Sequence, residues 1–309
     1  MITRWSILHR AAATLVCGAL SLGFARADVG SAHGTLISLP HSSRQFTQQQ
    51  IDDPFNHPDW YPDRHPPMPA VVQFGNQAKG LWACAVCHLT SGSGHPESAA
   101  IGGLPADYIY RQLQAFKGWQ RLDQTGAMFL FVMPQDDAEL KRAAEYFASL
   151  HPVNSLRVVE TNDVPITFVN ERFLRVVREG PGGGREPIGR RIITVPEDPR
   201  RAEARDPFGK FIVYVPEGSV ARGKKIAASG TSHSQPCASC HGENMKGTAV
   251  APPLAGQFPD YLLRQLNAFK WGNRRLGADS GESMQIQARY LTEEEMLDVA
   301  AYLASLPRD

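Results

Sequence analysis

Two short segments of the chain repeat one arrangement of residues that can carry chemistry. Each has two thiols three positions apart and a histidine directly after the second thiol. These residues are Cys84, Cys87 and His88 in the first segment, and Cys237, Cys240 and His241 in the second. The C-x-x-C-H spacing is typical of covalent haem attachment, because two thiols add to the vinyl groups of one porphyrin. The adjacent imidazole can then bind the iron as its proximal ligand. The sequence therefore predicts two covalently bound haem c groups.

Two other uses of such thiol pairs fit the sequence less well. A structural zinc site would need all four cysteines around one ion, yet the segments are much further apart than the usual ligand spacings. A thioredoxin-like redox pair would need a βαβ setting, which neither flank supplies. Haem attachment remains the favoured interpretation of both segments.

The first 27 residues have the pattern of a cleaved export signal. Basic residues at Arg4 and Arg10 precede an apolar run over residues 11–24, and Ala25-Arg26-Ala27 offers a cleavage site. A membrane anchor is the alternative, but the run is shorter than the roughly 20 residues that span a bilayer. We expect cleavage after about Ala27, a periplasmic protein and no membrane span in the mature chain.

Cysteine count and charge limit the remaining functions. The fifth cysteine, Cys17, lies in the leader, so cleavage leaves thiols only in the two motifs. Lys and Arg number 32 against 31 Asp and Glu, and no clustered basic surface indicates a nucleic-acid partner. A local docking patch for a redox protein remains compatible with this balance.

The regions after the two motifs repeat each other. Residues 107–117 align with residues 260–270 at an offset of 153, which is also the offset between His88 and His241. Residues 144–150 align with residues 300–306 at an offset of 156. Apolar residues at i, i+4 and i+7 predict an amphipathic helix in each aligned segment. The final helices have capping-box spacings at their starts, from Asp136 to Glu139 and from Thr292 to Glu295. The aromatic residues of the repeat are expected in core and haem packing; they are Tyr108, Phe116, Tyr261 and Phe269.

A methionine stands at the same place in both copies. At the offset of 156, Met128 corresponds to Met284. A thioether opposite the histidine would complete a six-coordinate iron suited to electron transfer. The alternative is that these methionines fill gaps in the core. Met133 is a rival in the first copy, although its alignment partner is Arg289, and Met245 is too close to His241 in sequence to reach the opposite face.

These features resemble the di-haem class I cytochromes c of the cytochrome c-four kind, in which two similar domains are joined in tandem. The resemblance is greatest in the second copy, in the motif itself, in residues 253–257 and 261–270, and in Met284. It implies a mainly α fold with two haem ligand pairs, His88 with Met128 and His241 with Met284. It also implies that the proximal histidine donates to a backbone carbonyl at the position of Pro253, where the first copy has Ala100.

The predicted organisation has five parts. They are a signal peptide over 1–27, an N-terminal extension over 28–74, a cytochrome domain over 75–151, a β-rich segment over 152–221 and a second cytochrome domain over 222–309. The family leaves 152–221 unexplained. Apolar runs at 164–169, 190–195 and 210–215 predict short strands, and 181–184 a flexible loop. The arginines of this segment fit either a docking surface or a solvated face balanced by acidic residues.

Three functions follow from this organisation. The first is a non-enzymatic carrier of single electrons between a donor and an acceptor protein. The second is a di-haem enzyme, either peroxidase-like or a sulfur-compound dehydrogenase, which requires an iron with an open or non-methionine distal position. The third is a haem subunit of a larger dehydrogenase or oxidase complex. Because both motifs have an equivalent methionine, the sequence favours the carrier.

Overall fold

The computed structural model describes residues 34–275 and 281–308, and the structural statements below concern these residues. The predicted signal peptide over 1–27, Cys17 and the expected cleavage after about Ala27 lie outside them. No helix in the described ranges is long and apolar enough to cross a membrane.

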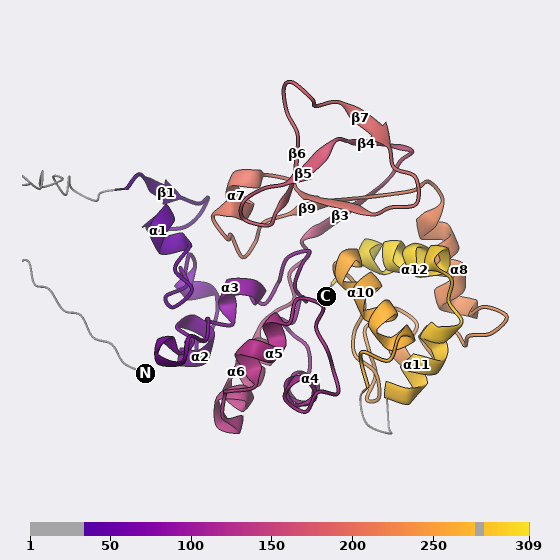
Figure 1. The fold of residues 1–309 in the computed structure, drawn as a ribbon, viewed down its shortest axis with the longest axis horizontal. Helices are drawn as coiled ribbons and strands as arrows, with labels where there is room; N and C mark the ends of the chain where they lie inside the picture. The colour runs from indigo at the N-terminus through magenta and orange to yellow at the C-terminus, as the bar shows by residue number, and fades with distance from the viewer. Residues whose placement is uncertain (1–33, 276–280, 309) are drawn as a thin grey trace, which may run out of the picture. The chain divides into compact units, whose positions relative to one another are not determined.

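Four helices follow one another in the same order in two parts of the chain (Figure 1). The first set is α3 (Ala85–His88), α4 (Ala106–Lys117), α5 (Ala127–Val132) and α6 (Asp137–Ser149). The second set is α9 (Ala238–His241), α10 (Pro259–Lys270), α11 (Gly281–Arg289) and α12 (Glu293–Ser305). The expected fold class, mainly α with a β-containing segment, is confirmed.

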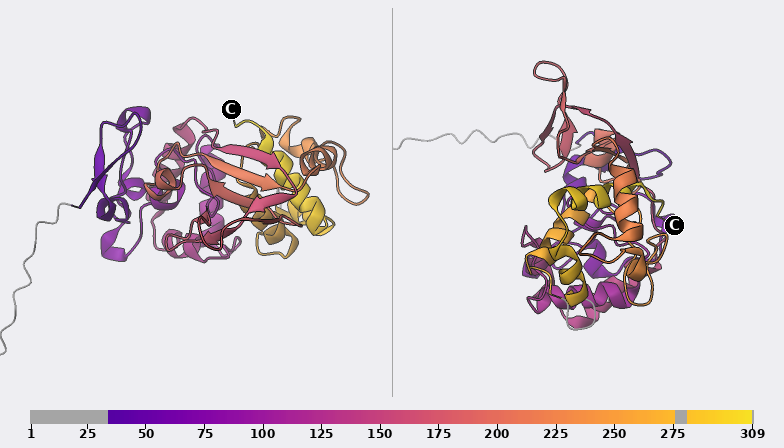
Figure 2. Two further views of the ribbon diagram at one scale, coloured as in Figure 1. Left: turned by 90° about the horizontal axis from the view of Figure 1, so that it is seen from above. Right: turned by 90° about the vertical axis from the view of Figure 1, so that its right-hand side faces the viewer.

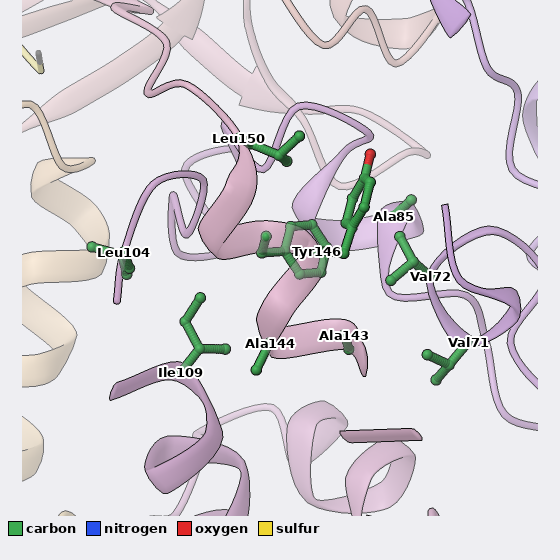
Figure 3. Close-up of a cluster of buried hydrophobic side chains, with 10 residues drawn as sticks. Val71, Val72, Ala85, Leu104, Ile109, Ala143, Ala144, Tyr146 and Leu150 are labelled. Carbon is green, nitrogen blue, oxygen red and sulfur yellow. The ribbon is translucent and has the colours of Figure 1, made fainter. Parts of the chain in front are cut away.

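The first core lies between α4, α6 and the short helix α2 (Ala70–Gln73). The apolar face predicted for α4 is buried, including Ile109. Figure 3 shows this side chain close to residues of α6, with Val71 and Val72 of α2 on the other side. The predicted start of α6 is correct, because the Asp136 carboxylate accepts the backbone N–H of Glu139.

The second core lies between α12, α10 and α8 (Ser219–Ser229). Thr292 and Glu295 form the complete capping box that the sequence predicts at the start of α12. Gly223 of α8 lies directly against the backbone of Asp298 in α12, where a Cβ atom would be 1.9 Å from the carbonyl oxygen. The close approach of these two helices therefore requires glycine at this position.

The N-terminal extension packs against the inter-domain segment. Its elements are β1 (Leu36–Ser38), β2 (Gln45–Thr47), α1 (Gln48–Ile51), the 3₁₀ turn Pro62–Arg64 and α2, which is followed by the 3₁₀ turn Gln77–Lys79. Trp60 is fully buried, and its indole N–H donates to the Ala204 carbonyl at 2.8 Å. Ala204 directly follows α7 (Pro199–Glu203). The extension thus shares a core with residues more than a hundred positions away.

The inter-domain segment contains a three-stranded sheet in the order β3-β9-β8, whose strands lie side by side in Figure 2. β9 (Phe211–Val215) is central, parallel to β3 (Leu156–Glu160) and antiparallel to β8 (Ile193–Pro196). Two small antiparallel pairs complete the segment. They join β4 (Asp163–Pro165) to β7 (Arg185–Pro187), and β5 (Thr167–Val169) to β6 (Arg175–Val177). The sequence patterns predicted strands at β4, β5, β8 and β9 but not at β3, β6 or β7.

Candidate haem sites

Each C-x-x-C-H motif forms one helical turn. Cys84 has helical backbone angles and is the N-cap residue of α3, and Cys237 is the N-cap residue of α9 in the same way. Residues three apart in a helix share a face, so the two thiols of each motif point to one side. The four motif cysteines form no disulfide in the structure. Each thiol pair is therefore available for a single flat ligand.

Both motif histidines are held by a backbone carbonyl. Nδ1 of His88 lies 2.9 Å from the Ala99 oxygen, and Nδ1 of His241 lies 2.8 Å from the Pro252 oxygen. A carbonyl can only accept, so each Nδ1 carries the hydrogen and each Nε2 keeps its lone pair. Burial lowers the pKa of both imidazoles. These are the properties of a neutral imidazole oriented to bind a metal.

The expected acceptor positions were wrong by one residue. The resemblance placed the carbonyls at Pro253 and Ala100, whereas the structure uses Pro252 and Ala99. These two residues are themselves equivalent at the offset of 153, so the repeat relation holds. The sequence pattern predicts which turn supplies the oxygen. It does not predict which carbonyl of that turn faces the imidazole ring.

Burial keeps the thiols of Cys84, Cys87 and Cys237 protonated. It raises the pKa of Cys84 to about 12, and it also raises the pKa of Cys87 and Cys237. Redox-active C-x-x-C pairs have the opposite property, a thiol with a lowered pKa. Within the described ranges, no three His, Cys, Asp or Glu side chains come together in a way that could hold a metal ion. These observations fit thiols that become thioethers on a haem.

The four candidate methionines differ in their surroundings. Met128 lies near the start of α5, half-buried against a cluster that includes Phe116 and Val132. Met284, its equivalent, is half-buried in α11. Met133 is 45% exposed at the end of α5, and Met245 is 1% exposed within the second core. Met245 therefore fills the core.

The surroundings of the two methionines differ in polarity. In the first copy, the Trp82 ring stacks on Phe131 of α5 with centroids 5.2 Å apart. In the second copy, the equivalent residues are Gln235 and Gln287, and the Gln287 side chain accepts the Gln235 N–H at 2.7 Å. Both domains have a contact at this position. It joins two aromatic rings in the first domain and two glutamines in the second. The two copies therefore differ in polarity at this position.

The histidines outside the two motifs differ in their surroundings. His57 is 1% exposed, and neither ring nitrogen has a hydrogen-bond partner among the described residues. His95 accepts the Glu97 N–H at Nδ1. Burial lowers the pKa of both rings to about 3. His65 pairs with Asp59, His41 is exposed, and His33 lies outside the described residues.

A network missed by the sequence analysis joins the two domains. Arg121 and Arg274 are buried, and each donates to the side-chain oxygens of both Gln112 and Gln265 at 2.7–3.0 Å. Each arginine also donates to the hydroxyl of the tyrosine in the opposite domain, at 3.0 Å. The repeat alignment contained the signal, because Arg121 and Arg274 are equivalent at the offset of 153. No carboxylate among the described residues pairs with either arginine, and the glutamine and tyrosine oxygens supply the acceptors for both buried cations.

The inter-domain segment also reaches the first motif. Arg205 donates to the Val86 carbonyl inside the motif at 2.7 Å. Ser91 and Ser93, just after the motif, both donate to the Pro207 carbonyl. Elsewhere in the segment several arginines pair with carboxylates, among them Arg172 with Asp52. These pairs favour the solvated-face interpretation of the basic residues.

A repeated unit of a thiol-bearing helical turn, an oriented histidine and two packed helices defines a c-type cytochrome. A family model for cytochrome c matches residues 220–307. Cytochrome c-554(547) of Halothiobacillus neapolitanus is 35% identical over 86 residues, which are 26% of this chain and 94% of that protein. The chain belongs to the cytochrome c family, and its tandem arrangement is like that of cytochrome c4.

Two further similarities extend over most of the chain. Cytochrome c-552 of Acidithiobacillus ferridurans is 26% identical over 230 residues, covering 72% of this chain and 73% of that protein. The solved structure of thiosulfate dehydrogenase (TsdBA) from Marichromatium purpuratum aligns with a TM-score of 0.51 and 24% identity. That alignment covers 75% of this chain and 38% of the other, and it supports the fold alone.

Proposed function

We propose that the chain is an exported di-haem cytochrome that carries single electrons between a donor protein and an acceptor protein. Each haem c would be attached through one motif, to Cys84 and Cys87 or to Cys237 and Cys240. The iron ligands would be His88 with Met128, and His241 with Met284. When bound, the haem supplies the reversible one-electron chemistry, and the protein supplies the ligands, the orientation and the buried surroundings.

One observation carries this proposal. Both motif histidines hold their Nδ1 hydrogen on a backbone carbonyl at equivalent positions, 99 and 252, which leaves Nε2 free in both domains. The equivalent methionines lie on equivalent helices, α5 and α11. Two closed, six-coordinate irons transfer electrons with little rearrangement and offer no open position to a substrate.

Spectroscopy of the oxidised protein tests the ligand sets. The wild type is expected to show two methionine-to-iron charge-transfer signals in absorption and magnetic circular dichroism. Met128→Ala should remove one signal and Met284→Ala the other, each leaving about half of the intensity. Met133→Ala, one residue past the end of the helix that contains Met128, is the matched control and should keep both.

A different result would favour an enzyme. A high-spin iron in the resting wild type would contradict the carrier proposal and point to an open distal position. Turnover with peroxide or thiosulfate would then separate a peroxidase-like enzyme from a sulfur-compound dehydrogenase. If Met128→Ala instead left both signals intact, the ligand assignment would be wrong, and another methionine such as Met133 would bind the first iron.

The number of haems and the cellular location of the protein can each be tested separately. The mass of the purified protein should exceed that of the polypeptide by two haems, and by one haem when both cysteines of one motif are changed to serine. Export is supported by the leader pattern. A mature N-terminus at Asp28 in the periplasmic fraction would agree with it, whereas an intact Met1 on a cytoplasmic protein would contradict it.

A further inference from the structure

A glutamine of the second domain forms hydrogen bonds with the loop that orients His88 in the first domain. Gln257 is 4% exposed and lies just before α10. Its side-chain oxygen accepts the Ala100 N–H at 3.3 Å, and its side-chain nitrogen donates to the Ala100 carbonyl at 2.7 Å. One amide group therefore satisfies both backbone polar groups of a single residue across the domain boundary.

An arginine near the end of the chain holds the same loop. Arg308 is buried and donates through one nitrogen to the carbonyls of Ala100 and Gly102, at 2.8 and 2.9 Å. Its own backbone N–H donates to the Asn154 side chain. The loop has little freedom to move away, because a Cβ atom on Gly102 would be 2.5 Å from the Ser91 oxygen. A cation is thus fixed beside the turn that carries the histidine's acceptor.

These contacts lead directly to His88. The Ala100 N–H and the Ala99 carbonyl belong to one peptide group, and that carbonyl accepts the His88 Nδ1 hydrogen. Hydrogen bonds in series polarise one another, so an acceptor on the Ala100 N–H strengthens the Ala99 oxygen as an acceptor. The series runs from the Gln257 oxygen through one peptide group to the His88 ring.

The second domain has no equivalent series. The residues at the positions of Gln257 and Arg308 in the first domain are Leu104 and Pro152, neither of which has a polar side chain. The acceptor for His241 belongs to the peptide between Pro252 and Pro253, which has no N–H. The contact therefore acts in one direction, from the second domain to the first haem site.

We infer that Gln257 and Arg308 are positioning residues through which the second domain sets the reduction potential of the haem at His88. This inference rests on the proposed function. A stronger Ala99 acceptor makes the His88 ring more electron-rich, which favours the ferric state and lowers the potential. The buried cation of Arg308 favours the ferrous state and raises the potential. The two residues act on the same loop with opposite signs.

Potentiometric titration of the fully loaded protein tests the inference. Gln257→Leu copies the residue of the first domain and should raise the potential of the first haem. Arg308→Met should lower that potential. We expect each variant to change the electron equilibrium between the haems about threefold, or about 28 mV at 59 mV per tenfold. The second haem, resolved by the Met128→Ala and Met284→Ala spectra, is the internal reference.

Two further variants separate the effect from a general loss of structure. Arg308→Lys keeps the cation and should retain most of the wild-type potential. Arg190→Met removes a charge from a highly exposed side chain and should leave both potentials unchanged. In Gln257→Leu, the NMR signal of the His88 Nδ1 hydrogen should also move, since its acceptor weakens.

Two outcomes would overturn the inference. One is an unchanged first potential in fully loaded Gln257→Leu, and the other is an equal shift of both haems in either variant. Failure of the proposed function is recognised separately, because a high-spin iron would already be present in the wild type. Loss of haem in one variant leaves Arg308→Lys and the NMR signal as the deciding measurements.

Discussion

At the residue scale, the buried side chain of His57 links the stability of the fold to pH. His57 stays neutral in the folded protein because burial lowers its pKa from 6.5 to about 3. The unfolded chain accepts a proton on this residue near pH 6.5, so the unfolded state binds more protons between about pH 6.5 and 3. The stability from neutral His57 is complete above pH 6.5 and is lost as the pH falls.

The first prediction uses this difference in proton binding. His57→Leu should reduce the slope of the free energy of unfolding against pH by about 1.4 kcal/mol per pH unit between pH 6 and 4. Urea unfolding at several pH values measures that slope. His151→Leu is the control, because His151 is exposed. An unchanged slope in His57→Leu would show that the ring is already protonated or paired in the folded state.

At the same scale, the sequence pattern identified the cysteines and histidine of each motif, but it did not identify correctly the residues that contact the histidine and its loop. The C-x-x-C-H spacing identifies thiols and histidine because one helical turn brings them together. The choice of the Ala99 and Pro252 carbonyls depends on the path of a loop and was missed by one position. Gln257 and Arg308 left no local pattern, since their targets lie more than 150 residues away in the sequence. The methionine ligands stay predictions.

At the scale of elements, the contact between α8 and α12 depends on one glycine. The Gly223 backbone lies so close to Asp298 that an added methyl group would displace one of the two helices. Gly223→Ala should lower the free energy of unfolding by about 2–3 kcal/mol, as overpacking does in other cores. Thermal and urea unfolding provide the measurement. Lys224→Ala, at an exposed position of α8, should change it by less than about 0.5 kcal/mol.

In the repeat, α4 and α10 were predictable from one continuous apolar face each, although neither has a side-chain cap, whereas α6 and α12 also have a polar start signal. The capping residues at Thr292 and Asp136 mark those starts correctly. β3 was missed because it pairs in parallel with β9, a strand more than 50 residues later. Parallel pairing leaves no turn signal beside the strand. The boundaries proposed for the five parts of the chain remain predictions.

At the scale of the whole molecule, the N-terminal extension and the inter-domain segment stabilise each other through Trp60. Its indole is buried against Ala204 and lies edge-on to Phe46, with ring centroids 4.7 Å apart. Trp60→Ala should cost about 3–5 kcal/mol. It should also increase protease cleavage near residues 199–208. Trp271→Ala, at a highly exposed tryptophan, is the matched control and should leave both measurements near the wild type.

A result in which Trp60→Ala unfolds like the wild type would show that the extension contributes nothing to this core. The sequence predicted only an N-terminal extension over residues 28–74. Its contact with residues near Ala204 joins apolar residues from two distant stretches, and neither stretch has a periodic pattern. Long-range packing of this kind cannot be obtained from local propensity.

The arginine network between the domains has a consequence for the origin of the chain. Arg121 of the first domain contacts the same residues as Arg274 of the second, with the domains exchanged. Such reciprocity is the rule where two identical subunits meet about a two-fold axis. Here it occurs within one polypeptide, so the interface has the form of a symmetric dimer whose subunits were fused. Gln257 and Arg308 then mark positions at which the two halves ceased to be interchangeable.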